Sequence, residues 1–124
     1  MQKIVLISGS GQQRTQKSSV RELYTGRSFR ANLETALELV PERKIFVLSA
    51  KFGLLRLDEQ VPPHDDNLAG LSDAQLRRWA NGVLYQLAAQ ADLEQDQFIL
   101  LAAPRYRKYL LPALKQVEVP AAEK

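Results

Sequence analysis

Three short apolar runs rich in β-branched residues constrain this chain more than any other feature. They are KIVLIS at 3–8, KIFVLS at 44–49 and QFILLA at 97–102. Continuous apolar runs of this length, without polar alternation, are typical of strands buried on both faces of a parallel sheet. A fourth and shorter strand is predicted at 117–119. The segments 9–19 and 50–71 are predicted to be connections, because they are polar or contain Gly and Pro.

Between these strands, apolar residues recur at the spacing of a helix. One helix is predicted to begin at Ser28 and to end before Pro41. A second is predicted after Ser72, since Ser72 and Gln75 have the spacing of a capping box. A third is predicted at 106–114. Strands that alternate with helices predict an α/β fold. We therefore expect one three-layer domain over residues 1–124, with a short, mostly parallel sheet of about four strands and helices on both faces.

The composition excludes several classes of site. The 124 residues include no cysteine and one histidine, His64. A disulfide scaffold, a cysteine nucleophile, a Cys-ligated metal and a His-rich metal site are therefore excluded, and we expect neither metal nor cofactor. No apolar run approaches the roughly 20 residues that span a bilayer. The apolar part of the N-terminus is too short for a signal peptide. The expectation is a cytoplasmic protein without membrane association.

The charge is unevenly distributed along the chain. Residues 1–30 hold six basic residues and one acid, and a second basic block lies at 104–115. The segment 58–66 holds four acids and no Lys or Arg. Basic blocks that meet in space would attract the phosphates of a nucleic acid or a nucleotide. The same charge would also suit a solvated surface, and the sequence leaves both interpretations open.

Candidate ligand contacts follow from the predicted sheet. Ligands of open parallel sheets bind outside the carboxyl ends of the strands. This rule selects the residues that follow the three strands: Ser8, Ser10, Ser49, Lys51, Phe52, Gly53, Arg105 and Tyr106. Small residues at 8–11 could bring backbone amides to a phosphate, or could form a flexible turn. Phe52 could stack on a base, or could pack beneath its own loop.

Two further segments carry candidate residues. His64 lies beside Asp65 in a long loop, an arrangement that suits proton transfer. A structural histidine and an Asx turn made by Asp65 or Asp66 are the alternatives. Tyr24, Thr25 and Gly26 precede the first predicted helix, where an aromatic face, a hydroxyl and a helix start could contact an anionic ligand.

Several of these segments together resemble a known family. They are LYTG at 23–26, VLSAKFGLL at 47–55, Pro-x-Asp-x-x-Leu at 63–68, Trp79, and the Leu, Tyr and Pro pattern of 101–114. Their order and spacing is similar to the YaaA-like, or "peroxide stress protein", domains of bacteria and phages. The resemblance covers nearly the whole chain and implies an α/β fold, DNA binding and protection from oxidative damage.

The chain departs from that family at three places. The family usually has a Lys-x-Lys-like pair in its first loop, where this chain has Arg14 and Lys17. His64 stands where a tyrosine usually precedes the aspartate. The family also usually continues beyond the last short strand with a Gly-containing segment, whereas this chain ends soon after Val119 and Pro120.

One reaction suits the candidate residues. Cleavage of an N-glycosidic bond builds positive charge on the sugar, which a carboxylate stabilises while a donor assists the leaving base. Asp65 would be the carboxylate, and His64 or Lys51 the donor, in a metal-independent hydrolase. Whether the protein is an enzyme stays open. The alternatives are a DNA-binding stress-protection module without catalysis, and an interaction protein that has lost the site. The sequence leaves the oligomeric state undetermined.

Overall fold

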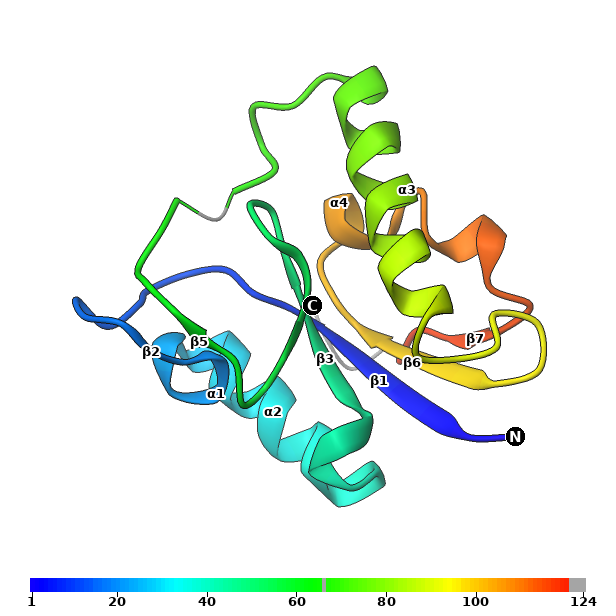
Figure 1. The fold of residues 1–124 in the computed structure, drawn as a ribbon, viewed down its shortest axis with the longest axis horizontal. Coiled ribbons are helices and arrows are strands. Elements are labelled where there is room, and N and C mark those ends of the chain that lie inside the picture. Colours follow the sequence, from blue (N-terminus) through cyan, green and yellow to red (C-terminus); the bar gives the residue numbers. More distant parts are fainter. Residues whose placement is uncertain (66, 121–124) are drawn as a thin grey trace.

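A computed structural model describes residues 1–65 and 67–120 of the chain. Its main sheet has five strands in the order β4-β3-β1-β6-β7 (Figure 1). Four of them are parallel, namely β1 (Lys3–Ser8), β3 (Ile45–Ser49), β6 (Gln97–Leu101) and β7 (Gln116–Glu118). The fifth, β4 (Gly53–Arg56), returns antiparallel to β3. A separate two-stranded ribbon joins β2 (Ser18–Ser19) to β5 (Gln60–Val61).

Helices cover both faces of the main sheet. On one face lies α2 (Arg27–Leu39), with the short α1 (Val20–Leu23) beside it (Figure 1). On the other lie α3 (Asp73–Ala88) and α4 (Pro104–Arg107). Two 3₁₀ turns complete the elements, at Glu42–Lys44 and Leu111–Ala113. The structure confirms the predicted α/β fold.

The central strand shows why its sequence lacks polar alternation. Side chains of β1 alternate between the two faces of the sheet. Val5 and Ile7 join the core under α2, whereas Ile4 and Leu6 join the core under α3. All four side chains are buried. A strand with a core on each side therefore needs apolar residues at consecutive positions.

The predicted capping box is present at the start of α3. The Ser72 side chain accepts a hydrogen bond from the amide of Gln75, and the Gln75 side chain accepts one from the amide of Ser72. By contrast, α2 begins at Arg27 with Gly26 as its N-cap, one residue before the predicted start at Ser28. No helix among the described residues is long and apolar enough to cross a membrane.

The prediction of one unbroken connection over 50–71 was wrong. The segment contains β4 and β5. Gly53 adopts a φ of 79°, which L-residues with a side chain rarely do, and this turn folds the chain back onto β3. Leu54 and Leu55 are then buried as strand residues.

The prediction of one helix over 106–114 was also wrong. The chain forms α4, which begins at Pro104, and then the separate 3₁₀ turn at Leu111–Ala113. Pro112 lies within that turn and has no amide hydrogen to continue an α-helix from α4. The last predicted strand is present, but it spans Gln116–Glu118 rather than 117–119. Residues 121–124, where a frayed end is predicted, lie outside the described residues.

Candidate functional site

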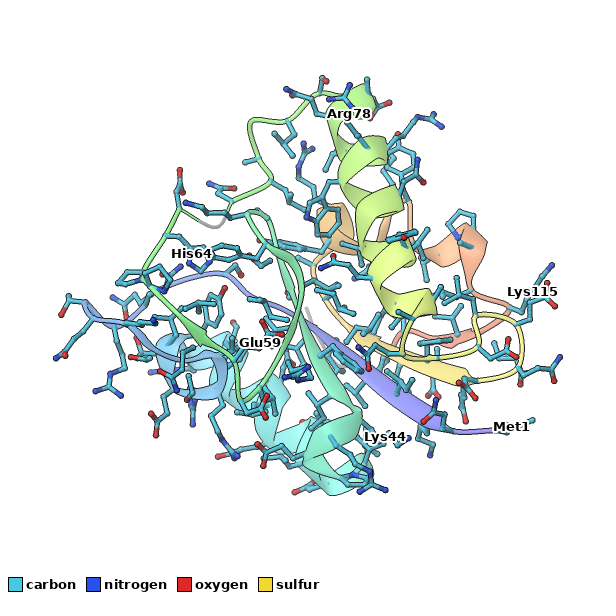
Figure 2. The ribbon with its side chains drawn as sticks, in the orientation of Figure 1. Met1, Lys44, Glu59, His64, Arg78 and Lys115 are labelled. Atoms are coloured by element: carbon cyan, nitrogen blue, oxygen red, sulfur yellow. The ribbon has the colours of Figure 1, made fainter. Side chains whose placement is uncertain are left out.

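A polar hollow of about 460 Å³ lies at the carboxyl edge of the sheet. Three segments line it: the chain after β1, the loop before α3, and α4. Figure 2 shows His64 of this loop on the far side of the molecule from Met1 and Lys44, which precede β1 and β3. We call it the carboxyl-edge hollow, and its lining residues are Ser10, Gly11, Gln13, His64, Asp65, Asn67 and Tyr106.

A glutamine holds the backbone of His64 in place. The Gln13 amide group donates to the carbonyl oxygen of His64 at 2.9 Å and accepts from its backbone amide at 2.9 Å. The backbone of Gln13 forms an antiparallel bridge with Tyr24. Gln13 therefore joins the chain after β1 to the segment before α2 and to the His64 loop.

The imidazole of His64 lies between two protein groups. Its Nδ1 is 2.8 Å from the carbonyl oxygen of Pro62, and its Nε2 is 3.2 Å from the hydroxyl of Tyr24. Because a carbonyl oxygen only accepts, Nδ1 carries a hydrogen. In the neutral ring, Nε2 then accepts from the Tyr24 hydroxyl, an assignment that follows from this hydrogen-bond network.

Aromatic rings pack behind the His64 loop. Phe52 meets the imidazole edge to face, with 4.8 Å between ring centroids. Tyr24 is fully buried and lies 4.9 Å from Phe29, centroid to centroid. Lys51 is exposed, with its Nζ 5.6 Å from the centroid of Phe52. The ring of Phe52 therefore supports the histidine, and Lys51 is not among the lining residues of the carboxyl-edge hollow.

The two serines that end β1 and β3 brace turns at this edge of the sheet, Ser8 the turn after β6 and Ser49 the turn after β3. The Ser8 hydroxyl accepts a hydrogen bond from the amide of Ala103 at 3.3 Å. The Ser49 hydroxyl accepts from the amides of Lys51 and Phe52, at 3.2 and 3.0 Å. Both serines are buried. They shape the edge of the sheet from beneath, while Ser10 is the serine that lines the hollow.

Of the two predicted residues in α4, only Tyr106 lines the hollow. Its hydroxyl donates to the carbonyl oxygen of Gly9 at 3.4 Å. Arg105 turns to the preceding loop, where its guanidinium donates to the carbonyl oxygens of Leu68 and Leu71. Arg105 therefore fixes the chain between Asn67 and the start of α3.

The remaining predicted residues lie at other positions. Thr25 and Tyr24 border a second hollow, together with Arg14, Glu22 and Arg30. Gly26 is the N-cap of α2, and Gly53 forms the turn into β4. Residues of the two basic blocks border different hollows: Arg14 and Arg30 border this second one, whereas Arg105, Arg107 and Lys108 border another.

The structure thus brings Ser10, His64, Asp65 and Tyr106 to one hollow. Sequence reasoning missed Gln13 and Asn67. For Asn67 the sequence did carry a signal, because an Asx turn is predicted in this loop, at Asp65 or Asp66. Asn67 forms an Asx turn, since its side-chain oxygen accepts from the amide of Ala69 at 2.8 Å. Nothing local distinguishes Gln13 from the other polar residues of its segment.

The fold and this hollow define a class: an open α/β domain with a polar hollow at the carboxyl ends of its parallel strands, the place where ligands of such sheets bind. A family model matches residues 4–124, and the chain belongs to that family, which is described as a family of unknown function (DUF6884). No curated protein and no solved structure matches the chain. Within the described residues, no group of three or more His, Asp or Glu side chains could hold a metal ion.

Proposed function

We propose that the protein binds a nucleotide-type ligand in the carboxyl-edge hollow and hydrolyses its N-glycosidic bond. The observation that carries this proposal is the convergence of Asp65 with the side chains of Ser10, Asn67 and Tyr106 in one hollow. Its volume of about 460 Å³ is in the range of small-molecule sites. Its position at the strand ends is where ligands of open α/β sheets bind.

Asp65 is the carboxylate of the proposed reaction. It is exposed in the hollow, and the neighbouring His64 backbone is held by Gln13. In the hydrolysis, the bond between the anomeric carbon and the base nitrogen breaks, and its electron pair leaves with the base. A water oxygen bonds to that carbon and gives one proton to Asp65, while the base takes a proton from solvent. The carboxylate also stabilises the positive charge that develops on the sugar.

The surroundings of His64 and Lys51 change the roles expected for them. Lys51 is not among the lining residues of the carboxyl-edge hollow. Both ring nitrogens of His64 contact protein groups, so we assign it as a positioning residue beside Asp65. Asn67 is the better candidate to contact the leaving base. Its side-chain oxygen accepts from Ala69, and its amide nitrogen supplies the donor for a base edge.

The test is mass spectrometry of bases released from DNA, RNA and a nucleotide pool. We expect a released base and a loss of at least about 100-fold in rate for Asp65→Asn, as for removal of a general base. Glu34→Gln, at an exposed position on α2, is the matched control and should keep the wild-type rate. Release that persists in Asp65→Asn, or no release from any pool, would refute the proposed hydrolysis.

The basic groups around Tyr109 favour nucleic-acid binding without catalysis as the alternative function. Arg77 and Lys108 lie on the ring of Tyr109, at 4.7 and 5.2 Å from its centroid. Basic and aromatic groups of this kind suit a phosphate backbone. This alternative predicts DNA binding that weakens steeply with salt and that Asp65→Asn leaves unchanged. Protection of DNA from oxidative damage would then be the role to test in cells.

A further inference from the structure

A second hollow of about 370 Å³ adjoins the segment before α2. We call it the arginine hollow, and it is lined by Arg14, Glu22, Tyr24, Thr25 and Arg30. Two guanidinium groups and one carboxylate give it a net positive charge. The role of Asp65 proposed above does not involve these arginines, so their common position calls for a separate explanation.

The two hollows share a wall. Tyr24 lines the arginine hollow, and its hydroxyl lies 3.2 Å from the Nε2 of His64, which lines the carboxyl-edge hollow. Gln13 and Arg14 are consecutive residues that line one hollow each. The amide of Arg14 also donates to the carbonyl oxygen of Leu23 at 2.8 Å, which fixes these residues against the segment that carries Tyr24. The arginine hollow therefore adjoins the carboxyl-edge hollow along Tyr24 and the Gln13–Arg14 segment.

The charged groups of this hollow are suited to an exchangeable anion. Arg14 and Glu22 are 3.6 Å apart, and both side chains are about half exposed. Such pairs contribute little to stability, so a stronger anion can take the place of Glu22. Arg30 is anchored by a hydrogen bond to the carbonyl oxygen of Arg21, and guanidinium has further donors for a ligand. The first turn of α2 contains no acidic residue that would oppose an anion here.

We infer that the arginine hollow binds a phosphate group on the sugar of the ligand, an inference that rests on the proposed function. Guanidinium groups match the geometry of phosphate oxygens better than ammonium groups do. Arg14 and Arg30 bind the phosphate, Thr25 offers a hydroxyl, and Glu22 competes with the phosphate for Arg14. The phosphate can come from a mononucleotide or from a nucleic-acid strand, since both have a sugar phosphate.

The test measures binding of ribose 5-phosphate, ribose and a short oligothymidylate by isothermal titration, with amide chemical shifts to locate the site. Arg14→Gln and Arg30→Gln should each weaken ribose 5-phosphate about tenfold, the loss of one charge-assisted contact. Glu22→Gln should strengthen it, because the competing carboxylate is gone. Arg43→Gln removes the same charge at the opposite edge of the sheet and is the control. Thermal denaturation checks that each variant is folded.

The outcomes separate a failure of the phosphate site from a failure of the proposed hydrolysis. Equal affinity for ribose and ribose 5-phosphate, or losses in Arg14→Gln and Arg30→Gln no larger than in Arg43→Gln, would overturn the phosphate site. Arginine-dependent binding supports it, and the tighter of ribose 5-phosphate and oligothymidylate identifies the source of the phosphate. If base release requires Asp65 but its KM in Arg14→Gln and Arg30→Gln equals that of the wild type, this inference alone is refuted. Arginine-dependent binding of ribose 5-phosphate without base release would refute only the hydrolysis.

Discussion

Replacement of Gly9 by alanine tests the packing beneath the candidate site. Gly9 follows β1, and its amide donates to the carbonyl oxygen of Leu48 at 2.8 Å. A Cβ atom here would lie 2.7 Å from Cγ1 of Val47, 2.8 Å from Cζ of Tyr24 and 2.9 Å from the Tyr24 hydroxyl oxygen. Both neighbours are fully buried, so neither has room to move away. The added methyl group must therefore displace the core or the Tyr24–His64 contact.

The size of the effect follows from two opposing contributions. Overpacking of a well-packed core costs about 1–3 kcal/mol. Alanine restricts the unfolded chain more than glycine does, which offsets about 0.4–1 kcal/mol. We expect Gly9→Ala to lower the free energy of unfolding by about 1–2 kcal/mol. For a chain of 124 residues this corresponds to a fall in Tm of about 3–10 °C.

Urea unfolding and thermal denaturation measure this change. Gly82→Ala is the matched control, because the residue is inside α3 and the Cβ it would add meets nothing within 4 Å apart from its chain neighbours and the nearby backbone of that helix. It should raise the free energy of unfolding by about 0.5–1 kcal/mol. If Gly9→Ala is as stable as the wild type, the close approach of Tyr24 and Val47 is incorrect. A combination of Gly9→Ala with Tyr24→Leu should cost less than the sum of the single changes, since they share one contact.

Two further predictions concern the loop of the site and the acid stability of the fold. Gln13→Glu keeps an acceptor for the His64 amide but sets a carboxylate against the His64 carbonyl oxygen. We expect Gln13→Glu to lower the free energy of unfolding by about 1–3 kcal/mol, because the His64 carbonyl oxygen loses its donor. Urea unfolding measures this change, and a variant as stable as the wild type would show that the paired bonds are absent. A hydrogen bond from the Asp92 amide, with others from Gln2, holds the pKa of Asp96 below its usual range. The stability from this lowered pKa is present above about pH 4 and is lost as the pH falls through the folded-state value. Urea midpoints should therefore fall less below pH 4 in Asp96→Asn than in the wild type, and equal slopes would contradict the assignment.

The strands that the sequence predicts are those with apolar residues at consecutive positions. β1, β3 and β6 have this pattern because a core lies on each face of the sheet. β4 lacks it, since it comprises only Gly53–Arg56. Its backbone depends on a distant residue: the Gln86 side chain accepts from the amide of Leu54 at 3.0 Å and donates to the Leu54 carbonyl oxygen at 3.5 Å. A contact across 32 residues leaves no local pattern from which to predict this strand.

The candidate site is predictable to the extent that the sheet determines it. Ser10 and Tyr106 each follow a parallel strand, so the rule for carboxyl ends places them at the same edge. The rule does not reach Asp65, because its loop follows β5 of the separate ribbon. Asp65 lines the hollow because its neighbour His64 is held at its backbone by the Gln13 side chain and at its ring by Tyr24 and Phe52.

These contacts explain why a loop residue can be proposed as the reacting group. A catalytic carboxylate must be held close to its working position, and loops achieve this only when other elements fix them. Here the His64 backbone is fixed by Gln13 and the ring by Tyr24 and Phe52, each from a different segment. Arg105 fixes the loop again at Leu68 and Leu71. Asp65 thus lies between two anchored points of the loop and lines the carboxyl-edge hollow, which favours it over Lys51 as the reacting group of the proposed hydrolysis.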